Sequence, residues 1–264
     1  MFPASALPLL LSTFQGASPA VDTHFNITYA EGKVIDAEKH KLDIYVPKGR
    51  KDVPVFFFVH GGAWRSGDRT RYAPLGNRFA REGLAVVIPS YRLSPANQHP
   101  AHIEDVAAAY AWTVRNIAGY GGDVSRIYIG GHSAGGHLVS LLALDPQYLK
   151  KYEIAQSTIR SVITMSGVYD VQLLVHIFGD NEQVRREASP MHHVKSQAPP
   201  FVVTYCQFDY PFLEPQAKAF HEALGKVGVS SELVYVPGET HISEIVNIVK
   251  DGDLTAKTVL RIVR

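Results

Sequence analysis

Cysteine is almost absent from this chain of 264 residues, which holds only Cys206. A single cysteine cannot form an internal disulfide, so a disulfide framework is excluded. Twelve histidines are present, but His192 and His193 form the only adjacent pair, and no cysteine and histidine cluster has zinc-site spacing. We therefore expect neither a metal ion nor a cofactor.

A strong excess of one charge is also lacking. Lys and Arg together number 26, and Asp and Glu number 25, which leaves a net charge of +1. This balance gives no sign of a basic surface for nucleic acid. No apolar run approaches the roughly 20 residues that a membrane-spanning helix needs. We expect no nucleic-acid partner and no membrane span.

Repeats, low-complexity tracts and linkers are missing as well, and the length fits one large α/β domain over residues 1–264. The N-terminus is ambiguous. Residues 7–11 are apolar and residues 17–20 are small, as in a secretory signal, but no Lys or Arg precedes Lys33. We expect a cytoplasmic protein, and the alternative is a secreted one with a trimmed or atypical signal.

The chain instead contains a regular alternation of strand-like and helix-like segments. Such alternation predicts a parallel sheet with right-handed crossovers. Residues 166–198 lack a strong period and are predicted to form a small cap of short helices over the site. Strands are predicted at residues 25–30, 41–46, 53–59, 84–88, 127–129, 161–165, 201–206 and 231–236, and the main helices at 72–82, 101–117 and 214–227 and directly after Ser133.

The most informative motif is Gly131-His132-Ser133-Ala134-Gly135, between a predicted strand and a predicted helix. A serine at such a turn is held in a strained backbone conformation, with its hydroxyl exposed above the sheet edge. It also lies at a helix N-terminus, where backbone N–H groups favour developing negative charge. Ser133 is the candidate nucleophile, and the alternative is an ordinary glycine-rich turn.

Two further candidates follow the last two predicted strands. In an open α/β sheet, functional residues collect beyond the carboxyl ends of the strands. His241 is placed to act as general base, and Asp209 to orient its imidazole. Asp170, Asp180 and Glu239 are competing acids. The order of nucleophile, acid and base along the chain is that of α/β-hydrolases.

The stretch His60-Gly61-Gly62 follows the third predicted strand and offers unobstructed backbone donors. The N–H groups of Gly61 and Gly62, together with that of Ala134, are the candidate oxyanion hole for a tetrahedral intermediate. We expect His60 to stabilise the loop. Trp64 either lines the substrate pocket or packs in the core, and we include it as a candidate pocket residue.

With these residues located, the chain resembles the α/β-hydrolase superfamily over nearly its whole length. Within it, the chain is similar to hormone-sensitive-lipase-type esterases and to the bacterial carboxylesterase/feruloyl-esterase-like group. The resemblance implies an α/β-hydrolase fold, with a mostly parallel eight-stranded sheet flanked by helices, and serine hydrolysis without a cofactor. The motifs that carry it are His60-Gly-Gly-Ala-Trp64, Tyr91-Arg-Leu-Ser-Pro95, Gly131-His-Ser-Ala-Gly135, Asp209 and His241.

The substrate is less well defined by this resemblance. Hormone-sensitive-lipase relatives usually carry three glycines in a row, whereas Ala63 and Trp64 follow two here. The His-Gly-Gly-x-Trp version is similar to feruloyl-esterase-like enzymes and to kynurenine formamidases. We expect a carboxylesterase that acts on a small-molecule ester of a short acyl or small aryl acid. The alternatives are an aryl formamide hydrolase and a catalytically inactive binding protein of the same fold.

Overall fold

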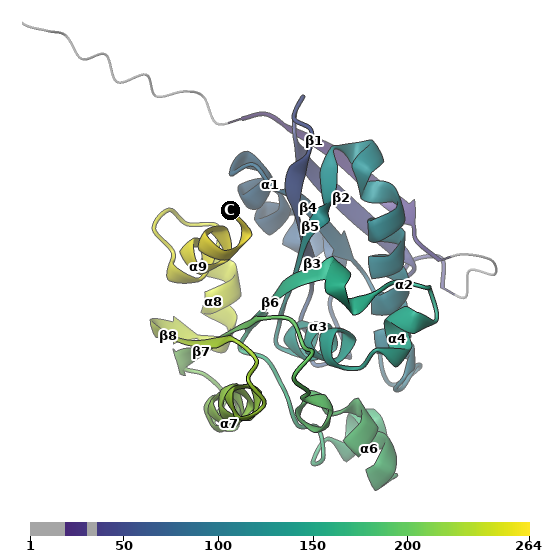
Figure 1. The fold of residues 1–264 in the computed structure, drawn as a ribbon, viewed down its shortest axis with the longest axis vertical. Coiled ribbons are helices and arrows are strands. Elements are labelled where there is room, and N and C mark those ends of the chain that lie inside the picture. The colour runs from purple at the N-terminus through teal and green to yellow at the C-terminus, as the bar shows by residue number, and fades with distance from the viewer. Residues whose placement is uncertain (1–18, 31–35) are drawn as a thin grey trace, which may run out of the picture.

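The computed structural model describes residues 19–30 and 36–264, so most of the signal-like N-terminal segment lies outside the described residues. Within these ranges, eight strands form one sheet, in the order β1-β2-β4-β3-β5-β6-β7-β8 (Figure 1). The strands are β1 (Val21–Thr28), β2 (Lys41–Pro47), β3 (Val53–Val59), β4 (Ala85–Pro89), β5 (Gly122–His132), β6 (Ile159–Met165), β7 (Phe201–Phe208) and β8 (Ser231–Thr240). β2 runs antiparallel to both its neighbours, and all other pairs are parallel. The predicted mostly parallel eight-stranded sheet is confirmed.

Each face of the sheet is covered by its own apolar cluster. Because side chains alternate along a strand, Phe56 and Phe58 of β3 point into one cluster, while Val55 and Phe57 point into the other. Burial on both faces explains why β3 is apolar throughout.

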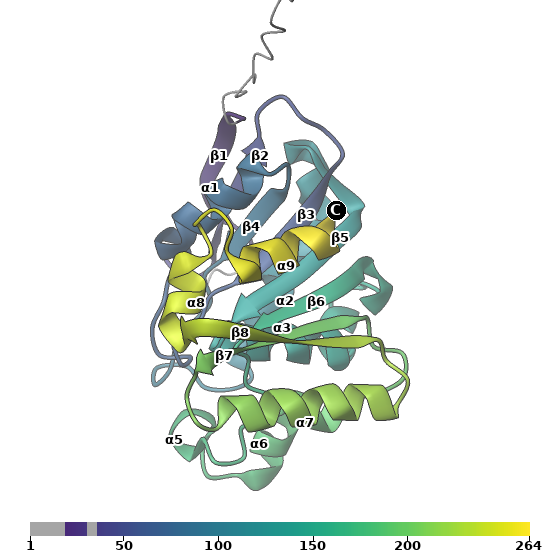
Figure 2. The same cartoon turned by 90° about the vertical axis from the view of Figure 1, so that its left-hand side faces the viewer.

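Helices α1 (Ala73–Arg81) and α9 (Leu254–Val263) supply the first cluster, and α2 (Ala101–Asn116) and α3 (Ala134–Leu144) supply the second. α7 (Leu213–Lys226) lies against β7 and β8 (Figure 2). The short helices are α4 (Gln147–Lys150), α5 (Val175–Phe178), α6 (Glu182–Ala188) and α8 (His241–Asn247), and the 3-10 segments are η1 (Arg69–Tyr72), η2 (Ile117–Tyr120), η3 (Gln156–Thr158) and η4 (Pro190–His193). Within the described ranges, no helix is long and apolar enough to cross a membrane.

Residues 166–198, the predicted cap, pack against α3 and α7. Tyr169 stacks on Phe220 of α7 with ring centroids 4.1 Å apart, and His137 of α3 lies edge-on to Phe178 at 5.6 Å. No residue of the range 166–198 lines the cavity at the candidate site.

Five neighbouring parallel strands set the position of the site. β3, β5, β6, β7 and β8 lie side by side, so the loops that follow them meet at one edge of the sheet. The residues directly after these strands are His60, Ser133, Ser166, Asp209 and His241.

Candidate active site

Ser133 lies at a sharp turn between β5 and α3. Its backbone has φ 55° and ψ −119°, a conformation that a non-glycine residue adopts only under strain. The turn is tight because its backbone approaches β3 closely: a Cβ on Gly135 would lie 2.0 Å from the carbonyl oxygen of Val59. The Ser133 N–H donates to the carbonyl oxygen of Met165 at 2.8 Å, which ties the turn to β6.

His241 is the first residue of α8, and a capping box fixes where that helix begins. The hydroxyl of Thr240 accepts from the N–H of Ser243 at 3.0 Å, and the hydroxyl of Ser243 accepts from the N–H of Thr240 at 2.8 Å. His132 adds a second constraint, since its Nε2 lies 2.8 Å from the carbonyl oxygen of His241 and donates to it. Burial lowers the pKa of His132 to about 3, so its ring is neutral.

Asp209 lies just beyond β7 and is hydrogen-bonded to His241, whose Nδ1 donates to Asp209 Oδ1 at 2.7 Å. The backbone N–H of Tyr210 also donates to Oδ1, at 3.0 Å. The Ser166 hydroxyl donates to Oδ2 at 2.6 Å, and the backbone N–H of Cys206 does so at 3.3 Å. Burial alone would raise the pKa of Asp209, but the hydrogen bonds from His241 and Ser166 hold it below its usual value. Asp209 is therefore an ionised acceptor that orients the imidazole.

Two of the competing acids have other partners. Asp170 accepts from the backbone N–H of Gln172 at 2.9 Å, and Glu239 accepts from the side chain of Asn247 at 3.0 Å.

A cavity of about 740 Å³ brings the candidate residues together. Ser133 and His241 both line it, although they are 108 positions apart in the chain. One wall is apolar and is formed by Ile242, Ile245, Val246 and Val249, in and just after α8. The other lining residues are Gly61, Gly62, Ala63, Ser66, Gly67, Arg71, Tyr72, Pro74, Leu75, His132 and Tyr210.

The glycine loop after β3 turns tightly at Gly62, which has a φ of 122°. Its carbonyl oxygen accepts from the N–H groups of Arg65 and Ser66, each at 3.0 Å. Ala134 is the first residue of α3, so its N–H belongs to the unpaired first turn of that helix. Gly61, Gly62 and Ser133 line the same cavity, and Ala134 directly follows Ser133.

Buried polar contacts hold this loop from behind. The ring of His60 stacks on Tyr91 with centroids 4.4 Å apart, and its Nδ1 lies 2.8 Å from the carbonyl oxygen of Gly61. Burial lowers the pKa of His60 to about 4, so the ring is a neutral hydrogen-bond partner. These contacts agree with the predicted loop-stabilising role.

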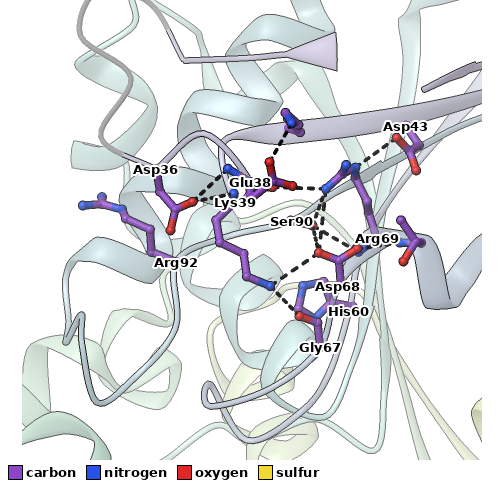
Figure 3. Close-up of polar contacts among 12 residues, drawn as sticks. Asp36, Glu38, Lys39, Asp43, His60, Gly67, Asp68, Arg69, Ser90 and Arg92 are labelled. Carbon is purple, nitrogen blue, oxygen red and sulfur yellow. Dashed lines mark hydrogen bonds and ion pairs between the residues drawn. The ribbon is translucent and has the colours of Figure 1, made fainter. Parts of the chain in front are cut away.

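A second layer of charged side chains ties the same loop to β2 (Figure 3). Lys39 Nζ donates to the carbonyl oxygen of Gly67 at 2.9 Å and lies 3.4 Å from Asp68 Oδ2. The buried Arg69 pairs with Asp43 of β2, with 3.0 Å between Arg69 Nε and Asp43 Oδ1. The loop is thus anchored at several points just beyond the glycines.

Trp64 lies in the core, away from the lining of the cavity. Its side chain is 3% exposed, and its indole N–H donates to His137 Nδ1 at 3.2 Å. The ring is edge-on to both His137 and Phe178, with centroid distances of 5.0 and 5.1 Å. The chain turns through left-handed conformations at Ala63 and Trp64, and the indole then fills the space beside α3. Of the two alternatives for Trp64, its contacts match packing in the core.

Several residues of the site were not identified from the sequence. Tyr72 lines the cavity. Burial raises the pKa of its hydroxyl, and a backbone hydrogen bond with Gly61 offsets part of that increase. Tyr210 lies 4.7 Å from His241 between ring centroids. The apolar wall of α8 has helical spacing, so its periodicity could have revealed it. Within the described ranges, no three metal-binding side chains come together.

Comparisons with known proteins give concordant results. The sequence model of the BD-FAE family matches residues 42–224. Esterase LipQ of Mycobacterium tuberculosis is 35% identical over 78% of this chain and 53% of its own length, so the chain spans about half of that relative. The kynurenine formamidase of Danio rerio is 25% identical over 96% of this chain and 86% of its own length. Esterase B of Lactobacillus rhamnosis has a similar structure, with a TM-score of 0.75 at 22% identity over 92% of this chain and 84% of its own. That likeness confirms the α/β-hydrolase fold.

Proposed function

The chain belongs to the BD-FAE family, and we propose on this premise that it hydrolyses carboxylic esters through an acyl-enzyme intermediate. One observation supports the proposal above all others. A serine in a strained turn and a histidine paired with a buried carboxylate face the same cavity, although they come from distant parts of the chain. The constellation of nucleophile, base and acid is recognised by geometry and role.

In the proposed reaction, the Ser133 hydroxyl attacks the ester carbonyl carbon while His241 Nε2 takes up the hydroxyl proton. Asp209 accepts from Nδ1, which leaves Nε2 free to act as the base and stabilises the imidazolium that forms. The proton then passes to the leaving alcohol oxygen as the C–O bond breaks. A water molecule, activated by the same imidazole, cleaves the acyl-serine ester and frees the acid.

The carbonyl oxygen gains negative charge during both steps. We assign its stabilisation to the N–H groups of Gly61, Gly62 and Ala134. Loss of one such donor typically costs about 10²–10³ in kcat. The anchored loop supports this assignment, because donors fixed before the reaction need no reorganisation when charge develops.

We propose a short acyl or small aryl acid as the acid portion of the substrate. The apolar wall supports an apolar group beside Ser133, and Val246 of that wall is 60% exposed. Tyr72 and Tyr210 offer ring faces on which an aryl group can stack.

We also propose that the protein is cytoplasmic, which cell fractionation would test.

Aryl formamide hydrolysis is the second candidate, because the formamidase relative aligns with most of both chains. The higher identity of the esterase relative favours esters. Kinetics on p-nitrophenyl acetate, butyrate and octanoate, methyl ferulate and N-formylkynurenine distinguish the two. We expect the highest kcat/KM on acetate, butyrate or ferulate, whereas a preference for N-formylkynurenine would reverse the assignment.

A further inference from the structure

Beyond the proposed triad, a hydroxyl bridges two carboxyl groups. Ser166 follows β6 directly and has a φ of 47°, another strained backbone position. Its Oγ lies 2.6 Å from Asp209 Oδ2 and 2.7 Å from Glu244 Oε2. Glu244 belongs to α8, three residues after His241, and is fully buried. The four side chains are therefore in contact one after another, from Glu244 through Ser166 and Asp209 to His241.

The number of protons shared by Glu244, Ser166 and Asp209 is fixed by the chemistry of their side chains. A serine hydroxyl has one proton and can donate it to one carboxylate, while its lone pairs can accept. Two ionised carboxylates would therefore leave one of these short contacts without a proton. One carboxyl group must carry a proton of its own and donate it to Ser166 Oγ, so that both contacts are hydrogen bonds.

The surroundings decide which carboxyl group holds that proton. Asp209 accepts four hydrogen bonds, from His241, Tyr210, Ser166 and Cys206. Such donors stabilise an ionised carboxylate.

Besides its contact with Ser166, Glu244 is hydrogen-bonded by the hydroxyls of Thr204 at 2.5 Å and Thr255 at 3.4 Å and by the thiol of Cys206. Burial raises the pKa of Glu244, and the nearby charge of Asp209 raises it further. The proton thus belongs on Glu244.

We propose that Glu244 is a neutral carboxylic acid in the resting protein and, through Ser166, a positioning residue for Asp209. Its O–H donates to Ser166 Oγ, and the Ser166 O–H donates to Asp209 Oδ2. This arrangement directs the other Asp209 oxygen at His241 and leaves a single negative charge beside the imidazole. The positioning role rests on the proposed function, whereas the protonation state does not.

Three further titratable groups near these side chains are neutral. Burial raises the pKa of the Cys206 thiol, which lies 3.6 Å from Ser166 Oγ, and that of the Tyr169 hydroxyl. Burial lowers the pKa of His132, whose ring centroid lies 4.6 Å from that of His241. None of them supplies a positive charge that would keep Glu244 ionised.

Glu244→Gln tests the protonation state without any substrate. The amide mimics the neutral acid, because its NH₂ can donate to Ser166 and its oxygen can accept from Thr204. In the wild type, the folded protein keeps a proton on Glu244 that the unfolded chain releases above about pH 4.5. Wild-type stability therefore falls relative to Glu244→Gln as pH rises, and the Tm of the variant should gain about 3–5 °C per pH unit between pH 5 and 8.

Glu239→Gln is the matched control. Hydrogen bonds from Ser243 and Asn247 lower the pKa of Glu239, so it stays ionised over that range and its Tm difference should be flat. A flat difference for Glu244→Gln would mean that Glu244 is ionised, and would overturn the proposal even if the protein hydrolyses no ester.

Kinetics on p-nitrophenyl butyrate test the positioning role. Ser166→Ala should lower kcat roughly 10-fold to 100-fold with little change in KM, since a hydrogen bond to a charged group is lost. The acid limb of kcat/KM should move to higher pH, because Asp209 and His241 then bind their next proton more tightly. Ser161→Ala, within β6, removes a buried hydroxyl that donates to the carbonyl oxygen of Pro200 at 3.0 Å, and should change neither kcat nor the pH profile.

If Ser166→Ala does not fold, two variants of Glu244 replace it. Glu244→Leu should lose kcat, and Glu244→Gln should recover most of that loss because it restores the donor to Ser166. Equal kinetics for Ser166→Ala and Ser161→Ala, or for Glu244→Leu and Glu244→Gln, would overturn the positioning role.

Discussion

Replacing Gly62 by alanine tests whether the glycine loop is built to bind an oxyanion. A Cβ at this position would lie 2.1 Å from the carbonyl oxygen of Ser66, and real Cβ atoms essentially never come within 3.0 Å of a neighbour. The loop would therefore have to shift by roughly 1 Å, a misplacement that can cost about 10²-fold in rate. The hydrogen bonds from the N–H groups of Arg65 and Ser66 to the carbonyl oxygen of Gly62 resist that shift.

We expect Gly62→Ala to lower kcat on p-nitrophenyl butyrate by about 100-fold or more, with a smaller change in KM. Gly83→Ala is the matched control, because Gly83 also has a positive φ, 99°, but open space around its Cβ position. Both variants bear backbone strain of about 1–3 kcal/mol, and only Gly62→Ala displaces the loop.

Steady-state kinetics at saturating substrate would be combined with thermal unfolding to confirm that both proteins are folded. Comparable losses of Tm with a large difference in kcat would support the oxyanion role. A kcat for Gly62→Ala within about threefold of that for Gly83→Ala would refute it.

Four further outcomes follow from the same geometry. Asp209→Ala should lower kcat by about 10³–10⁴, with KM nearly unchanged, on p-nitrophenyl butyrate. Thr240→Ala removes the cap of α8, which should cost about 1 kcal/mol in urea unfolding and lower kcat several-fold, since His241 begins that helix. Val246→Asp should raise KM for p-nitrophenyl octanoate more than for acetate, whereas the exposed Val124→Asp should change neither. Burial lowers the pKa of His132 to about 3 and that of His60 to about 4, so the stability that depends on their neutral rings is full above pH 6.5 and is lost as pH falls, and the urea midpoint should be lower at pH 4.5 than at pH 7.5.

The strands were predictable where burial produces a simple hydrophobic pattern in the sequence. β3 has the predicted bounds because both its faces are covered, which requires an unbroken apolar run. β5 begins at Gly122, five residues before the predicted segment, although residues 123–126 are mostly polar. Its start is set by pairing with Val53 and by the contacts of Asp123 with Ser125 and Arg126, which a hydrophobic pattern does not reveal.

The candidate triad was predictable because strand order converts chain position into spatial position. Ser133, Asp209 and His241 each stand just beyond a predicted strand, and parallel strands place such residues at one edge. Ser166 also follows a strand but was missed, because its role depends on Glu244, 78 positions away on a helix. Trp64 was left between two roles because its indole partners, His137 and Phe178, come from elements far along the chain.

Ser133 is the proposed nucleophile, and covalent labelling identifies the reactive serine. A fluorophosphonate probe should label the wild type at Ser133, as mass spectrometry of the modified peptide would show. Ser133→Ala should take up no probe and keep less than about one per cent of activity on p-nitrophenyl butyrate. Labelling at another residue, or full activity in Ser133→Ala, would show that Ser133 is not the nucleophile.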